Sequence, residues 1–223
     1  ISRGLVGSEM CIRDRLLVAS DSLGAFEMSL KGHLVMLHGM TGTSAKMMPL
    51  AKEITPSGWG CLCPEGPFIH PSGGRAWWLN EQGSKTSDSD IESQISISMD
   101  RLEGLLPPGK LILGGFSQGG AIASAMCERD TFDRVVGLVL IATKTVRNKE
   151  LKRKLNITRP RSVVWMHGER DHIIPIEAAL EHLTCFQDAG WTVDEFRHKK
   201  GHMVDLSQKA AMIQSLERVA RSV

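Results

Sequence analysis

The segment at residues 111–120, Leu-Ile-Leu-Gly-Gly-Phe-Ser-Gln-Gly-Gly, constrains the fold of this chain more than any other. An apolar run leads into the pattern Gly-x-Ser-x-Gly around Ser117, and the small residues of 121–126 follow. This order predicts a strand, a tight turn and a helix, because a Cβ at either flanking glycine would collide with neighbouring backbone. The turn exposes the hydroxyl of Ser117, and the positive end of the helix faces any oxygen that develops charge beside it. Ser117 is therefore a candidate nucleophile.

A serine nucleophile requires a base, and the base requires an acid that orients it. Where a strand, a turn and a helix present the serine in this way, the partners follow in the order Asp or Glu, then His. The apolar run 162–168 ends in a turn that contains Asp171, and a shorter strand over 191–196 is followed by a loop with His202. We expect Asp171 to be the acid and His202 the base.

Simpler interpretations of these residues exist. The Gly-x-Ser-x-Gly pattern also fits an ordinary turn at the start of a helix. Asp171 also fits a cap for the helix that Pro175 can open, in which case Glu169 could be the acid. The order of the three residue types along the chain favours the catalytic interpretation.

A second motif lies at residues 34–43, where a buried strand ends in His38-Gly39 and a loop leads to a helix from about residue 45. In this type of architecture the oxyanion hole uses one N–H after the nucleophile and one from this earlier loop. The corresponding donors are the backbone N–H groups of Gln118 and Met40. An ordinary strand-to-helix loop is the alternative. We expect His38 to be structural, with a hydrogen bond to the loop.

These segments resemble the phospholipase/carboxylesterase family of small α/β-hydrolases, which includes the acyl-protein thioesterases. The resemblance extends over residues 30–223, with all motifs in order: His38-Gly39-Met40, 115–120, 167–175 and Gly201-His202. It implies an α/β-hydrolase fold, with a mostly parallel sheet and helices on both faces. It also implies an esterase that forms an acyl-enzyme on Ser117 with Asp171 and His202, and that needs no cofactor.

The resemblance leaves the substrate open. Residues 41–43 lack the Gly-Asp pair common in the thioesterases, and 63–78 are more similar to bacterial carboxylesterases. Residues 142–145 lack the usual small apolar loop. Carboxylic esters are the expected substrates, and an acyl-protein thioesterase or lysophospholipase acting on long acyl groups is the alternative. A dienelactone-type hydrolase would require Cys at position 117, and a non-catalytic binding protein would be expected to lack a triad residue or the oxyanion loop.

Residues 64–87 form the longest stretch without a regular pattern, and long loops in compact domains usually carry function. We predict that Trp77 and Trp78 line a substrate pocket, with Ile174 and Met40 opposite. The alternative for each tryptophan is a place in the core. Arg75 either braces the loop or meets a substrate carboxylate.

The remaining pattern alternates strands with helices, which predicts right-handed crossovers and a mainly parallel sheet. Expected strands cover 16–20, 25–30, 33–38, 59–63, 111–116, 135–141, 162–168 and 191–196. Expected helices cover about 45–55, 88–106 and 205–221, besides those after Ser117 and Pro175. The last helix is expected to turn five residues inward: Leu206, Ala210, Ile213, Leu216 and Ala220. His167 is expected to brace a turn, and five other histidines to lie at the surface or at edges: His33, His70, His172, His182 and His198.

Length and charge limit the other possibilities. Residues 1–15 do not begin with Met and resemble translated sequencing-adaptor sequence, so we set them aside and expect one domain over 16–223. A net charge of +2 argues against a nucleic-acid partner. No apolar run is as long as a bilayer span, so stable membrane insertion is not expected. The basic stretch 147–154 is interpreted as a solvated face, with contact to a membrane surface as the alternative.

The five cysteines form no recognisable disulfide framework, and no Cys/His spacing resembles a zinc site. Free buried thiols in a reducing compartment are the preferred interpretation, so we expect a cytoplasmic protein without a bound metal. The expected partner is a small-molecule or lipid ester substrate, and a homodimer is compatible with this interpretation.

Overall fold

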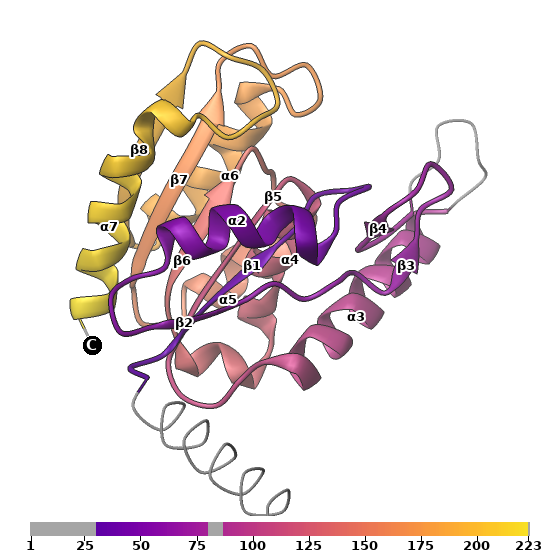
Figure 1. The fold of residues 1–223 in the computed structure, drawn as a ribbon. Coiled ribbons are helices and arrows are strands. Elements are labelled where there is room, and N and C mark those ends of the chain that lie inside the picture. Colours follow the sequence, from indigo (N-terminus) through magenta and orange to yellow (C-terminus); the bar gives the residue numbers. More distant parts are fainter. Residues whose placement is uncertain (1–29, 80–86, 223) are drawn as a thin grey trace, which may run out of the picture.

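The computed structural model describes residues 30–79 and 87–222, and a parallel sheet forms the centre of this part of the chain (Figure 1). Its strands, in spatial order, are β2 (Gly60–Leu62), β1 (His33–Leu37), β5 (Leu111–Phe116), β6 (Val135–Ile141), β7 (Ser162–Gly168) and β8 (Thr192–His198). Every neighbouring pair in this sheet is parallel. The strand expected over 16–20, most of that over 25–30, and the expected domain start lie outside the described residues.

Helices cover both faces of the sheet, as predicted. On one face, α2 (Ser44–Ile54) and α7 (Lys209–Arg221) pack on alternate strand residues such as Leu34 and Met36. The other face carries α3 (Asp88–Leu105), α4 (Gln118–Ala125), α5 (Asn148–Leu155) and α6 (Ile176–Asp188), which pack on the intervening residues such as Val35 and Leu37 (Figure 1). Because both faces are buried, the central strands are apolar without alternation.

The register of the sheet gathers the strand ends at one edge. Leu37 of β1 pairs with Gly115 of β5, and Phe116 of β5 pairs with Ile141 of β6. The loops that follow β1, β5, β6, β7 and β8 therefore begin side by side. In an open α/β sheet, this carboxyl edge is where ligands bind.

Helix α4 approaches the sheet so closely that Gly115 and Gly119 have no room for a side chain. A Cβ added to Gly119 would lie 2.3 Å from the carbonyl oxygen of Leu37, and one added to Gly115 would lie 2.4 Å from the carbonyl carbon of Gly119. Neither distance is possible for a real Cβ, so the glycines that flank Ser117 are required by the packing of backbone on backbone.

The stretch 64–87, expected to be irregular, contains a small antiparallel pair, β3 (Phe68–Ile69) and β4 (Arg75–Ala76), and residues 80–86 are outside the described part. The basic stretch forms α5, which buries Leu151 and Leu155 and exposes Lys152 and Arg153. These exposed cations match the solvated face that we predicted, but Arg147, just before the helix, is only 10% exposed and pairs with Glu128 at 2.9 Å.

The inward face predicted for the last helix is wrong at its start. Leu206 is 59% exposed, and Ala210 is exposed as well. A short 3-10 turn, η3 (Leu206–Gln208), precedes α7, so the helix begins later than expected. Of the residues predicted to face inward, Leu216 and Ala220 are buried and Ile213 is half-buried. The buried residues of α7 are Met212, Ser215, Leu216, Val219 and Ala220.

The prediction that His182 lies at the surface or at an edge is also wrong, whereas His198 does lie on an edge strand of the sheet. His182 is fully buried in α6, where it shares the inward stripe of Ala179, Leu183 and Phe186 at helical spacing. Burial lowers the pKa of His182 to about 3. His198, at the end of β8, is buried too, and its Nδ1 accepts a hydrogen bond from the N–H of Lys200.

Four thiols lie in the described part of the chain, at Cys61, Cys63, Cys127 and Cys185, and all four are free. Burial raises the pKa of Cys63 to about 11 and that of Cys127 to about 12. Among the described helices, none is both long and apolar enough to cross a bilayer.

Candidate active site

Ser117 stands at the turn between β5 and α4 in a strained backbone conformation. Its φ is 54° and its ψ is −119°, in a region that non-glycine residues rarely adopt. Hydrogen bonds to the end of β6 hold this turn. The N–H of Ser117 donates to Ile141 O at 2.9 Å, and the carbonyl of Ser117 accepts from the Thr143 hydroxyl at 2.7 Å. The strain is therefore maintained by the neighbouring strand, and the sequence pattern predicted the turn itself.

Asp171 and His202 meet across the loops that follow β7 and β8. His202 Nδ1 lies 2.7 Å from Asp171 Oδ2. Since a carboxylate only accepts hydrogen bonds, Nδ1 carries the proton and Nε2 is left with a free lone pair. The other oxygen, Asp171 Oδ1, accepts from the N–H groups of Ile173 at 2.8 Å and Ile174 at 2.9 Å.

The charge of Asp171 is stabilised in spite of its burial. Burial opposes ionisation, but the backbone hydrogen bonds from Ile174 and Ile173 and the contact with His202 outweigh it, so the pKa of Asp171 lies below its ordinary value. Glu169, the alternative acid, is exposed at the surface. His167 braces the same turn, because its buried Nε2 donates to Ile174 O at 2.9 Å.

The imidazole of His202 lies beside the serine turn. Its ring centroid is 4.8 Å from that of Phe116, the residue immediately before Ser117. The histidine, the buried carboxylate and the strained serine, which are separated widely in the sequence, are thus brought to one edge of the sheet.

The loop after β1 packs directly on the serine turn. A Cβ added to Gly39 would lie 3.3 Å from Ser117 Cβ and 2.9 Å from the Phe116 ring, so this glycine permits the close approach. His38 fixes the loop: its Nδ1 donates to Gly39 O at 2.7 Å, and its Nε2 accepts from Gly66 N–H at 3.0 Å. Burial lowers the pKa of His38, which keeps the ring neutral for this pair of hydrogen bonds.

Comparison with known proteins agrees with this geometry. Residues 32–158 match the family model described as the alpha/beta hydrolase fold, which is more than half of the chain. The chain belongs to the α/β-hydrolase family. The α/β-hydrolase fold expected from the sequence motifs is thereby confirmed.

Several named proteins are similar to this α/β-hydrolase. Acyl-protein thioesterase 1 of Cryptococcus neoformans is 25% identical over 161 residues, which are 63% of this chain and 66%, just under two thirds, of the relative. The crystal structure of esterase PE8 covers 86% of this chain and 94% of its own, with 18% identity and a TM-score of 0.70. The crystal structure of the Bacillus cereus carboxylesterase covers 85% of this chain and 89% of its own, with 18% identity and a TM-score of 0.67.

One predicted substrate contact of this α/β-hydrolase is wrong. Trp77 was expected to wall a pocket, but its side chain is 0% exposed and belongs to the core. Its indole N–H donates to His38 O at 2.8 Å, and its carbonyl accepts from the hydroxyl of Ser98. A ring with a polar N–H can be buried fully when that N–H has a partner, which is the case here.

Gln118 has a role that sequence reasoning missed. Its side chain accepts from the N–H of Trp77 at 3.1 Å and donates to the carbonyl of Trp78 at 2.9 Å. It thereby attaches the 64–79 segment to the first turn of α4. The signal in the sequence was a long polar residue among small and apolar ones. Thr143, the polar residue after β6, was missed in the same way.

Arg75 braces its loop, which was one of its two expected roles. Its backbone N–H donates to Gly42 O at 2.9 Å, and its Nε lies 3.4 Å from Glu65 Oε2. Glu65 Oε1 in turn accepts from the N–H of Ser44 at the start of α2. These contacts connect the 64–79 segment to the loop after β1.

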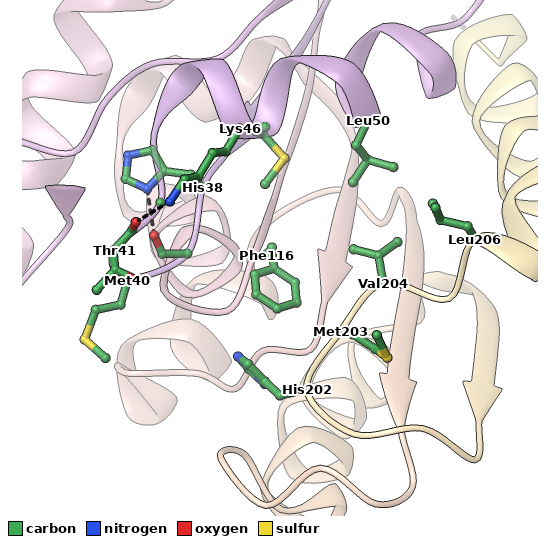
Figure 2. A pocket seen from close by; sticks show the side chains of 13 residues that line it. His38, Met40, Thr41, Lys46, Leu50, Phe116, His202, Met203, Val204 and Leu206 are labelled. Atoms are coloured by element: carbon green, nitrogen blue, oxygen red, sulfur yellow. Dashed lines mark hydrogen bonds between the residues drawn. The ribbon is translucent and has the colours of Figure 1, made fainter. Parts of the chain in front are cut away.

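Two hollows border the site of this α/β-hydrolase. The larger, about 510 Å³, is lined by Met40 and Phe116, by α2, and by the loop that carries His202 (Figure 2). The smaller, about 60 Å³, is lined by Trp78, Ser117, Gln118 and Ile174 among others. Met40 and Ile174, expected to face the tryptophans together, thus belong to different hollows.

Proposed function

We propose that this protein is a serine hydrolase that cleaves carboxylic esters through an acyl-enzyme intermediate. In this proposal Ser117 is the nucleophile, His202 the general base and Asp171 the acid that orients it. The observation that carries the proposal is the 2.7 Å hydrogen bond between His202 Nδ1 and Asp171 Oδ2, formed beside a serine held at a positive φ. That bond directs the proton-accepting Nε2 away from the carboxylate.

In the first half-reaction, His202 Nε2 takes the hydroxyl proton as Ser117 Oγ attacks the ester carbonyl carbon. The buried, ionised Asp171 stabilises the imidazolium that forms and keeps its ring in place. The tetrahedral intermediate then collapses, the bond to the leaving oxygen breaks, and His202 returns the proton to that oxygen. The acyl group remains on Ser117.

The backbone N–H groups of Met40 and Gln118 are the proposed oxyanion donors. Gln118 N–H is the first of α4, so it has no carbonyl partner within the helix and sits at the positive end of the dipole. Met40 follows Gly39, whose backbone lies against Ser117. Each donor is expected to contribute about 3–4 kcal/mol to stabilising the transition state.

In the second half-reaction, water takes the place of the departed alcohol or thiol. His202 removes a proton from this water as it attacks the acyl carbon, and then protonates Ser117 Oγ as the acid is released. Every proton in the cycle passes through one imidazole. The described side chains therefore suffice for a hydrolysis without a cofactor.

Labelling by a fluorophosphonate probe tests the nucleophile directly. We expect stoichiometric covalent labelling at Ser117, found by peptide mass spectrometry, together with turnover of p-nitrophenyl acetate. The Ser117→Ala variant should lose both while its circular dichroism spectrum and thermal midpoint stay close to the parent values. Labelling at another residue, or turnover retained in Ser117→Ala, would overturn the proposal.

The acyl-protein thioesterase named among the relatives suggests a related substrate class for the same chemistry. The similarity of this chain to that thioesterase supports hydrolysis of an ester or thioester bond. The volumes of the two hollows limit the size of the acyl group that the site accepts.

A further inference from the structure

The two hollows at the site differ about eightfold in volume, and they contact different members of the proposed triad. The larger, of about 510 Å³, is bordered by His202 and by the loop with Met40. The smaller, of about 60 Å³, is bordered by Ser117 and Gln118. The first volume is in the range of pockets that hold drug-sized ligands, and the second equals about two water molecules.

The chemistry of the triad assigns one half of an ester to each hollow. The alkoxy oxygen must lie within hydrogen-bond reach of His202, because that imidazole protonates it as the C–O bond breaks. The acyl carbon becomes bonded to Ser117 Oγ, so the acyl substituent extends from the serine and away from the histidine. The alcohol therefore faces the hollow beside His202, and the acyl group faces the hollow beside Ser117.

The larger hollow is suited to an apolar group. Its wall on the side of α2 and the His202 loop consists of Leu50, Met203, Val204 and Leu206, and Phe116 lies at its centre (Figure 2). Lys46, the cation at its border, turns its ammonium toward Thr41 O at 3.5 Å and away from this apolar wall (Figure 2).

The smaller hollow has room for a short acyl group only. Trp78 and Ile174 border it, and Gln118 holds the backbone of Trp78 in place through a 2.9 Å hydrogen bond. An acetyl group fits a space of about 60 Å³, whereas a hexanoyl chain is larger than this space.

We infer that the enzyme is selective for esters that join a short acyl group to a bulky apolar alcohol. This inference rests on the function proposed above and adds the class of substrate. It assigns the larger hollow to the alcohol and the smaller one to the acyl group. A thioesterase for long acyl chains requires the opposite assignment.

A pair of isomeric esters tests the inference at constant composition. Hexyl acetate and ethyl hexanoate contain the same atoms, but they place the long chain on the alcohol and on the acyl side, respectively. Hydrolysis of each is followed by titrating the released acid. We expect kcat/KM for hexyl acetate to exceed that for ethyl hexanoate by about tenfold or more, because buried methylenes contribute to transition-state binding only in the larger hollow.

The outcomes separate the two proposals. Equal rates, or a preference for ethyl hexanoate, would overturn the inferred selectivity and leave the serine hydrolase proposal intact. If neither ester is hydrolysed and the fluorophosphonate probe does not react, the proposed function itself fails.

A substitution within the larger hollow links the preference to this site. Leu50→Trp fills the space with a larger ring, so the ratio of the two kcat/KM values is expected to fall at least threefold. Ile157→Trp is the matched control, since Ile157 is 78% exposed after α5 and borders neither hollow. The ratio is measured within one preparation, so it does not depend on the folded fraction. A ratio unchanged in Leu50→Trp, or lowered equally in Ile157→Trp, would contradict the assignment.

Discussion

The hydroxyl of Thr143 donates a 2.7 Å hydrogen bond to the backbone carbonyl of Ser117. Thr143 follows β6, and Ser117 follows β5, so this bond ties the strained serine turn to the neighbouring strand end. The turn thus depends on a side chain that is distant in the sequence and takes no part in proton transfer.

Replacing this hydroxyl tests how far the strained turn depends on it. Thr143→Val keeps the shape of the side chain and removes the hydrogen bond, so we expect kcat for p-nitrophenyl acetate to fall about tenfold, with KM little changed. Thr158→Val is the matched control, because the Thr158 hydroxyl also donates at 2.7 Å to a backbone carbonyl, that of Lys154, far from the site. Equal kcat values in the two variants would show that Thr143 does not position the nucleophile.

The partner of His202 is tested by changing the carboxylate to an amide. Asp171→Asn preserves an oxygen that can accept from the N–H groups of Ile173 and Ile174, but it removes the charge and the acceptor for His202 Nδ1. We expect kcat/KM to fall roughly 10⁴-fold while the protein remains folded. Glu169→Gln, two positions earlier and exposed, should change kcat/KM by less than about twofold. The reverse pattern would make Glu169 the acid.

The buried His182 predicts a specific dependence of stability on pH. Its folded pKa is about 3, below the unfolded value of 6.5, so between these values the unfolded chain binds one more proton. The free energy of unfolding therefore falls as the pH is lowered through this window, by about 1.4 kcal/mol per pH unit from this residue. Urea titrations from pH 7 to pH 4 should show a smaller slope in His182→Leu. In the exposed His172→Leu the slope should match the parent protein, and a parent slope retained in His182→Leu would contradict the prediction.

The two hydrogen bonds of Gln118 are expected to contribute to stability. Gln118→Met removes both and leaves the buried N–H of Trp77 without its acceptor, so we expect a loss of about 1–3 kcal/mol in the free energy of unfolding. Gln208→Met is the control, since the Gln208 amide donates to Arg197 O at an exposed site and its loss should be close to neutral. Denaturant titration measures the free energy of unfolding of both variants. A loss of the same size in the control would mean that burial at Gln118 is not the cause.

Local patterns were sufficient to predict the elements that carry the site. The glycines around Ser117 and the apolar run before Asp171 determine the local structure over short distances, and the parallel sheet places the strand ends together. Asp171 and His202 are hydrogen-bonded in the structure, while the catalytic role of the three residues stays a prediction that the variants above test.

Features that depend on packing between distant segments were not predictable in this way. Trp77 is buried because His38, 39 positions earlier, offers a carbonyl to its indole. His182 is buried because α6 turns that stripe of the helix inward, and the residue type alone suggested the surface. The start of α7 at Lys209 was missed because a 3-10 turn precedes it, and this turn has no clear signature in composition.

The contact between Gly119 and the carbonyl of Leu37 has a consequence for anyone who wishes to alter what this protein accepts. Mutant libraries at Leu50 or Leu206 can explore many side chains, since these face open volume. Position 119 admits none, so even alanine there would push the helix off the sheet and displace the nucleophile with it. Directed evolution of this protein can therefore vary the residues that line the larger hollow, but it cannot vary the glycine that packs under the nucleophile.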